Sequence, residues 1–139
     1  MLIKLWMCWC KFWFKYYKWL NKNNKRGYNM DKKTLEALKG SIKKWSNIVK
    51  TTTVKDMGCA NCPLCALFSS SFCKGCPVRL KTGVKYCYKT PYPEWINHHY
   101  QKHDDGSFGR RRYKNCAKCL QLATDELNFL KSLLPEVKK

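Results

Sequence analysis

The sequence predicts a small, α-rich fold in which two antiparallel helices flank an irregular, cysteine-rich insert. Three observations predict this fold class. Apolar residues recur at helical spacing in two segments, one on each side of the middle of the chain. Paired cysteines crowd the segment between them, and proline and glycine interrupt that segment too often for long regular elements. A chain of 139 residues can build one domain with one modest core.

Residues 1–29 are predicted to be a separate part of the chain, a cationic and aromatic amphipathic extension. On a helix, one face would carry the lysines Lys4, Lys11, Lys15, Lys18 and Lys22. This pattern is typical of a helix that lies in a membrane interface. It does not predict a spanning helix, because lysines interrupt every apolar run before the roughly 20 residues that a span needs. Alternatively, the extension is dispensable and the folded protein begins near Met30.

Residues 30–139 are predicted to form a single helical domain whose insert covers residues 59–93. Asp31 is the expected N-cap of a first helix that ends near Lys50. Its apolar stripe comprises Leu35, Leu38, Ile42, Trp45 and Val49. Gly40 interrupts this helix and would allow another element to approach closely.

A second long helix is predicted from Cys116 to Leu134, where Pro135 would end it. Its stripe comprises Cys116, Leu120, Ala123, Leu127, Leu130 and Leu134. Between the two long helices, the sequence suggests one short strand at Val84–Tyr88. A short helix beginning near Trp95 would carry three histidines.

The insert contains two Cys-x-x-Cys pairs, and each pair can present two sulfurs to one ion. Cys62, Cys65, Cys73 and Cys76 are therefore the primary predicted ligands of a tetrahedral zinc ion. Secondary candidates are Cys59, Cys87, Cys116 and Cys119, and one of the histidines His98, His99 or His103 could replace a sulfur. An iron–sulfur cluster is the alternative cofactor, although the ten residues between Cys65 and Cys76 fit the ferredoxin spacing poorly. The close spacing within each pair favours metal over disulfides.

The chain carries 28 Lys and Arg against 9 Asp and Glu, a net charge of +19. Such a surface attracts polyanions, although biased genome composition alone also produces lysine-rich chains. Aromatic residues accompany the basic ones, as they do in proteins that stack on bases. The predicted nucleic-acid contacts are Arg110, Arg111, Arg112, Tyr113, Lys114, Lys74, Arg79, Lys81 and Lys85.

Several motifs resemble a family of small cysteine-rich proteins of bacteriophages and prophages. They are the run from Leu35 to Trp45, Asn61-Cys62-Pro63-Leu64-Cys65, Cys76-Pro77-Val78, Thr82-Gly83, Cys87, Thr90-Pro91-Tyr92 and the run from Glu126 to Leu134. The resemblance implies a viral or mobile-element origin and an architecture tied by metal, and it implies no catalytic activity. The N-terminal extension, the arginine triplet and the pair Cys116/Cys119 lie beyond the shared pattern.

These observations predict a non-enzymatic, zinc-binding viral accessory or regulatory protein. Its expected partner is nucleic acid or a nucleic-acid-containing host complex, and no small-molecule substrate is evident. One alternative is a protein that binds anionic membrane surfaces through residues 1–20. Another is a metal-dependent nuclease, although the histidine cluster lacks a His-Glu-x-x-His pattern. No signal peptide is apparent, so we expect the host cytoplasm, with a membrane-peripheral location if the extension binds lipid.

Overall fold

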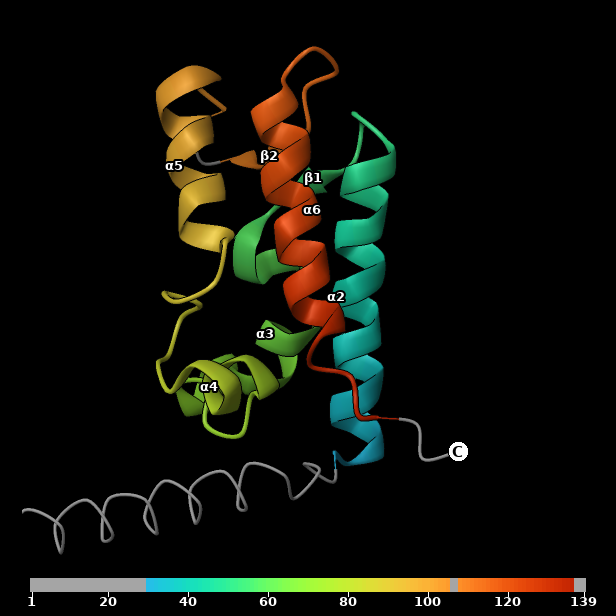
Figure 1. Cartoon of the computed structure of the whole chain (residues 1–139). Helices are drawn as coiled ribbons and strands as arrows, with labels where there is room; N and C mark the ends of the chain where they lie inside the picture. The colour runs from blue at the N-terminus through green and yellow to red at the C-terminus, as the bar shows by residue number, and fades with distance from the viewer. Residues whose placement is uncertain (1–29, 106–107, 137–139) are drawn as a thin grey trace, which may run out of the picture. The chain divides into compact units, whose positions relative to one another are not determined.

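The computed structural model describes residues 30–105 and 108–136, and helices dominate this part of the chain (Figure 1). The helices are α2 (Lys32–Lys50), α3 (Pro63–Phe68), α4 (Pro77–Thr82), α5 (Tyr92–Lys102) and α6 (Ala117–Lys131). Two 3₁₀ turns occur at Gly58–Asn61 and Ser69–Ser71. The strands β1 (Lys55–Asp56) and β2 (Arg110–Arg111) pair in antiparallel register, with Asp56 opposite Arg110. The predicted α-rich class is confirmed.

The amphipathic extension predicted for residues 1–29, and the membrane contact assigned to residues 1–20, lie outside the described residues. Among the helices that are described, none is long and apolar enough to cross a membrane.

The two long helices pack against each other and run in opposite directions (Figure 1). Helix α2 starts where predicted, because the Asp31 carboxylate accepts a hydrogen bond of 2.7 Å from the main-chain N–H of Thr34. Helix α6 starts after Cys116, whose sulfur occupies the equivalent capping position. Helix α6 ends at Lys131, three residues before the predicted end at Leu134.

The buried faces of α2 and α6 differ from the predicted stripes. Helix α2 buries Thr34, Leu38, Ser41, Trp45 and Ile48. Helix α6 buries Cys119, Leu122, Ala123, Glu126, Leu127 and Leu130, whereas Leu120 and Leu134 are exposed. Both helices therefore place polar groups in the core, and an apolar stripe cannot reveal such positions.

The segment 59–93 contains only short elements, as its prolines and glycines predict, but the strand expected at Val84–Tyr88 is absent. Those residues form bends and turns instead. Tyr86 and Cys87 both have a φ of 62°, which lies in the left-handed region and cannot continue a strand.

Gly40 permits a close approach between α2 and α3. A Cβ atom at this position would lie 2.9 Å from Cγ and 3.2 Å from Cβ of Pro63. Replacing a helix-interior glycine by alanine ordinarily stabilises a protein by about 1 kcal/mol. Because the Pro63 ring cannot rotate away, we expect Gly40→Ala to lower the free energy of unfolding by about 1–3 kcal/mol.

Urea denaturation followed by circular dichroism would measure the effect of Gly40→Ala. Lys39→Ala, one residue earlier on the exposed side of α2, is the matched control, and its effect should stay within about 0.5 kcal/mol. A stabilised Gly40→Ala variant would show that α3 does not pack this closely on α2.

Candidate metal centre and the buried polar network

The structure brings two histidines and two cysteines together at the junction of α5 and α6. His98 lies on the last turns of α5, and His103 is the residue at which α5 ends. Cys116 precedes the first turn of α6, and Cys119 lies within that turn. Because a helix repeats every 3.6 residues, the spacing of three between the cysteines sets both sulfurs on one side.

The separations of the four side chains are close to those that a tetrahedral metal site requires. His98 Nε2 lies 3.2 Å from Cys116 Sγ, and His103 Nε2 lies 3.2 Å from Cys119 Sγ. All four ligand atoms lie within 4.8 Å of one another. Zinc bonds of 2.0–2.3 Å in tetrahedral geometry place ligand atoms roughly 3.4–3.8 Å apart. The set could therefore close on one ion with small side-chain movements.

The charge states of these residues also suit a metal. Burial, followed by the neighbouring histidines, lowers the pKa of His98, and burial and His99 lower the pKa of His103. Both rings are therefore neutral at pH 7, the form that binds metal. Burial raises the pKa of the Cys119 thiol to about 12. A cation in the site would supply the positive charge that favours its thiolate form.

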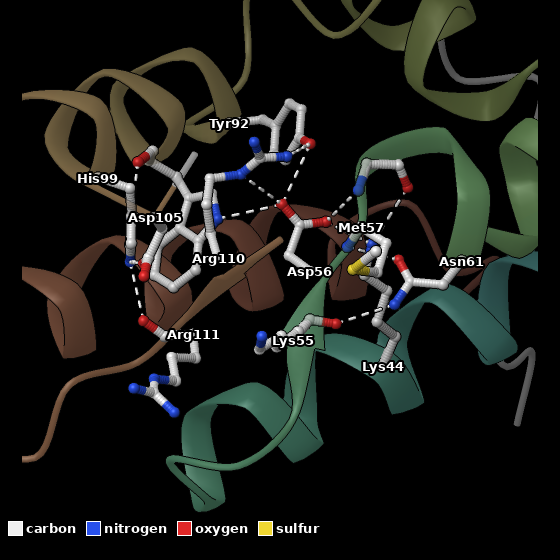
Figure 2. A network of polar contacts seen from close by, with 12 residues as sticks. Lys44, Lys55, Asp56, Met57, Asn61, Tyr92, His99, Asp105, Arg110 and Arg111 are labelled. Atoms are coloured by element: carbon white, nitrogen blue, oxygen red, sulfur yellow. Dashed lines mark hydrogen bonds and ion pairs between the residues drawn. The ribbon is translucent and has the colours of Figure 1, made fainter. Parts of the chain in front are cut away.

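His99 does not belong to this set. Its ring is buried, and Nδ1 and Nε2 each lie 2.8 Å from a main-chain oxygen, that of Trp95 and that of Arg111 respectively (Figure 2). Both nitrogens face acceptors, so His99 has no lone pair directed at a metal. These two contacts hold α5 against β2. The sulfur of Cys119 lies 3.6 Å from Nε2 of His99.

The ring of His103 is held by neighbouring side chains. The ring of Tyr113 stacks on that of His103, with a centroid distance of 4.0 Å and an interplanar angle of 11°. The Tyr113 hydroxyl donates to the carboxylate of Asp105, and the Arg111 guanidinium lies 5.3 Å from the Tyr113 ring. Such contacts hold a metal-binding imidazole in one orientation.

Asp56 is the centre of a buried polar network between β1, α2 and α5 (Figure 2). Its side chain is fully buried and accepts five hydrogen bonds. The donors are Lys44 Nζ at 2.6 Å, the Gly58 N–H at 3.0 Å, Arg110 Nε at 3.1 Å, Tyr92 Oη at 3.1 Å and Trp95 Nε1 at 3.2 Å. Arg110 also donates to the Tyr92 hydroxyl at 3.0 Å. The network joins segments more than fifty positions apart in the sequence.

The predicted zinc ligands lie in two different regions of the structure. The secondary candidates Cys116 and Cys119 belong to the site just described. Cys62, Cys65, Cys73 and Cys76, with Cys59 and Cys87, lie in the insert, and all eight described cysteines are free thiols. Among the described residues, only the set His98, His103, Cys116 and Cys119 has three or more ligand atoms that all lie within 4.8 Å of one another.

The residues predicted to contact nucleic acid differ in their exposure. Arg110 points inward to Asp56, and the Nε of Arg112 is buried without a hydrogen-bond partner. Arg79 is tied to the Phe72 carbonyl by a 2.8 Å hydrogen bond. The remaining basic side chains on the list are exposed, namely Lys74, Lys81, Lys85, Arg111 and Lys114, while Tyr113 is half-buried.

Sequence patterns named the four ligand residues as candidates, although not as one set, and they did not indicate Asp56. His98 and His103 are five positions apart and Cys116 and Cys119 are three positions apart, and both spacings occur in metal sites built from two histidines and two cysteines. The chain has only nine acidic residues against 28 basic ones, and Asp56 is one of the nine. Its burial depends on contacts with distant segments, which a local sequence pattern does not contain.

Comparison of the chain with protein-family models, with curated proteins and with solved structures found no match.

Proposed function

We propose that this chain is a non-enzymatic, metal-stabilised accessory or regulatory protein of a virus or mobile element that binds nucleic acid or a nucleoprotein complex. Zinc at His98, His103, Cys116 and Cys119 would tie α5 to α6, and the two long helices would hold the cysteine-rich insert between them. The viral origin rests on the resemblance described above. The observation that carries nucleic-acid binding is a tyrosine-lined pocket beside a basic segment.

The pocket lies on the face of α5 that turns away from the metal ligands. It has a volume of about 280 Å³ and is lined by Tyr86, Tyr88, Tyr92, Pro93, Ile96, Asn97 and Tyr100. Tyr88 and Tyr100 expose 68% and 82% of their surface. Exposed aromatic rings around an open hollow are suited to stacking on unpaired bases, whose flat faces all present π-electrons.

The charge next to the pocket fits a phosphate backbone. The segment 59–93 contains the basic residues Lys74, Arg79, Lys81, Lys85 and Lys89, and no acidic residue. The Lys85 ammonium lies 5.2 Å from the centre of the Tyr86 ring and 5.8 Å from that of Phe72. An ammonium held among rings can contact phosphate while the rings stack on the adjoining bases.

The metal set favours a structural role over hydrolysis. Two imidazoles and two thiolates fill the four positions of a tetrahedral zinc ion, so no position remains for an activated water molecule. Glu94 on α5 is exposed and lies 3.9 Å from Lys118 in a surface ion pair, and the Asp105 carboxylate near the site accepts a hydrogen bond from the Tyr113 hydroxyl. These features support an accessory protein rather than a nuclease.

Tyr88→Ala is expected to weaken binding to a single-stranded oligonucleotide about 5- to 150-fold, which corresponds to about 1–3 kcal/mol for a lost stacked base. Fluorescence anisotropy with a labelled single strand, and with a duplex of the same sequence, would measure this. Wild-type affinity should fall steeply as salt rises, because phosphate contacts release counterions.

Tyr88→Phe is the matched control, since it retains the ring and loses only the hydroxyl, and it should bind like the wild type. Equal affinity of Tyr88→Ala and wild type would remove the pocket from the binding surface. The absence of salt-dependent binding to either nucleic acid would contradict the proposed function.

A further inference from the structure

We infer that the insert binds a single strand of nucleic acid in preference to a duplex, with Phe72 as a second stacking residue outside the tyrosine-lined pocket. One unpaired base would stack on the tyrosines of the pocket, and a further base of the same strand would stack on Phe72. Lys85 would contact the phosphate between them. This inference rests on the proposed function and narrows its partner to single-stranded nucleic acid.

The ammonium of Lys85 lies near two aromatic rings that come from separate turns of the insert. It is 5.8 Å from the centre of the Phe72 ring and 5.2 Å from that of the Tyr86 ring. The Tyr86 ring in turn contacts Tyr88 edge-on, with ring centres 6.0 Å apart and an interplanar angle of 77°. A row of side chains therefore leads from the pocket, by way of Lys85, to Phe72.

All the side chains of this row are open to solvent. Phe72 exposes 63% of its surface, Tyr86 45% and Tyr88 68%, and Lys85 is exposed as well. Single exposed apolar residues are common on proteins, but neighbouring ones mark surfaces that bind a partner. Flat faces that reach solvent beside a cation are what a base and its phosphate require.

The backbone holds both rings near Lys85 in an unusual conformation. Phe72 has a φ of 53° and Tyr86 a φ of 62°, both in the left-handed region that residues other than glycine seldom adopt. Arg79 stabilises the first of these turns, because its Nη1 donates a hydrogen bond of 2.8 Å to the Phe72 carbonyl. Strained residues of this kind gather at binding sites, where the strain is retained because it presents a side chain to the ligand.

The insert is built to meet a single strand rather than a duplex groove. Its two helices, α3 and α4, have six residues each, which is too short for a helix that reads a groove. In a duplex the base faces are covered by neighbouring pairs, whereas an unpaired base can turn its face to a ring. The segment 59–93 also contains no acidic residue that would repel the phosphates.

Fluorescence anisotropy of the full-length protein with a labelled oligothymidylate, and with a duplex containing it, tests the inference. We expect Phe72→Ala and Phe72→Leu to weaken single-strand binding about 5- to 150-fold, because both remove the ring although leucine remains apolar. Phe72→Tyr keeps the ring and should bind like the wild type. Lys85→Gln should lower the slope of log affinity against log salt by about 1.

Leu80→Ala is the matched control, because Leu80 is 54% exposed on the same insert but has no ring. It should bind like the wild type. A loss in Leu80→Ala as large as that in Phe72→Ala would show general apolar contact instead of stacking and would overturn the inference.

The remaining outcomes separate this inference from the proposed function. If Phe72→Ala binds like the wild type, or if the duplex binds as tightly as the single strand, the inference is wrong and nucleic-acid binding stands. If the wild type shows no salt-dependent binding to either nucleic acid, both are wrong. Binding to vesicles of phosphatidylserine and phosphatidylcholine without binding to the oligonucleotide would also refute both, and would assign the surface to a membrane.

A measurement on the unmodified protein covers the case in which a variant does not fold. Wild-type protein is irradiated with an oligonucleotide that carries a halogenated uracil, which cross-links to an aromatic ring stacked on it, and mass spectrometry locates the adducts. We expect adducts at Phe72 and at Tyr86 or Tyr88. Adducts at the tyrosines alone would show that the strand does not reach Phe72.

Discussion

Asp56→Asn is expected to lower the free energy of unfolding by about 3–5 kcal/mol, enough to unfold a small domain of ordinary stability. The carboxylate lies between two partly or fully buried cations, since the Lys44 and Arg110 side chains expose only 8% and 16% of their surface. Asparagine keeps the volume but removes the negative charge. The two cations would then remain in the core without a counter-ion, which costs more than the lost hydrogen bonds.

Chemical denaturation of the variant beside Glu36→Gln would measure this effect. Glu36→Gln makes the same carboxylate-to-amide change on the exposed side of α2 and should alter stability by less than about 0.5 kcal/mol. If Asp56→Asn proved as mild as Glu36→Gln, the network would not be a principal source of stability.

The same network predicts an acid limit. Burial alone would raise the pKa of Asp56, but the charges of Lys44 and Arg110 outweigh it, so the pKa lies below its ordinary value. A depressed carboxylate pKa stabilises the fold above the unfolded pKa of about 3.9, and the stabilisation is lost as pH falls through the folded value. The contribution of Asp56 should therefore be complete at neutral pH and disappear only in strong acid.

The sequence predicted the helices because their determinants are local. Asp31 caps its own helix, and the spacing of Leu38 and Trp45 places them on one face. The predicted close approach at Gly40 also agrees with the contact to Pro63. The faces were predicted less well, because α2 buries Ser41, which accepts a hydrogen bond of 3.3 Å from the N–H of Leu64. Leu64 lies on α3, so the spacing of apolar residues in α2 cannot predict that Ser41 is buried.

The candidate site was predicted in outline only. Cysteine spacing identifies ligands that share a turn, as in Cys116 and Cys119, but it does not show which pair faces which. That choice depends on where α5 packs on α6, which brings His98 to Cys116 across eighteen positions of sequence. Arg110 gives the converse case. A run of three arginines suggests a nucleic-acid surface, yet β-pairing with Asp56 turns its first member into the core.

Loss of the metal at His98, His103, Cys116 and Cys119 is expected to have the largest effect on the fold. Structural zinc contributes about 10–16 kcal/mol to metallopeptides at neutral pH, so Cys119→Ser should cost on the order of 5 kcal/mol or more. The metal would be the main link that holds the end of α5 to the start of α6. Trp95 on α5 is fully buried and packs edge-on against Trp45 of α2, with ring centroids 5.3 Å apart. Release of α5 would expose Trp95 to water.

Chelation of the wild-type protein at pH 7 should therefore reduce near-ultraviolet circular dichroism, lower the melting temperature and shift tryptophan emission to the red. Cys119→Ser should show the same changes without a chelator, and Cys59→Ser should resemble the wild type, because Cys59 is exposed. Acidification should act like chelation once His98 and His103 protonate. Since the pKa of each lies below 6.5, that release should begin at a lower pH than for an ordinary histidine. A melting temperature indifferent to chelation would show that hydrogen bonds and packing hold α5 without a metal.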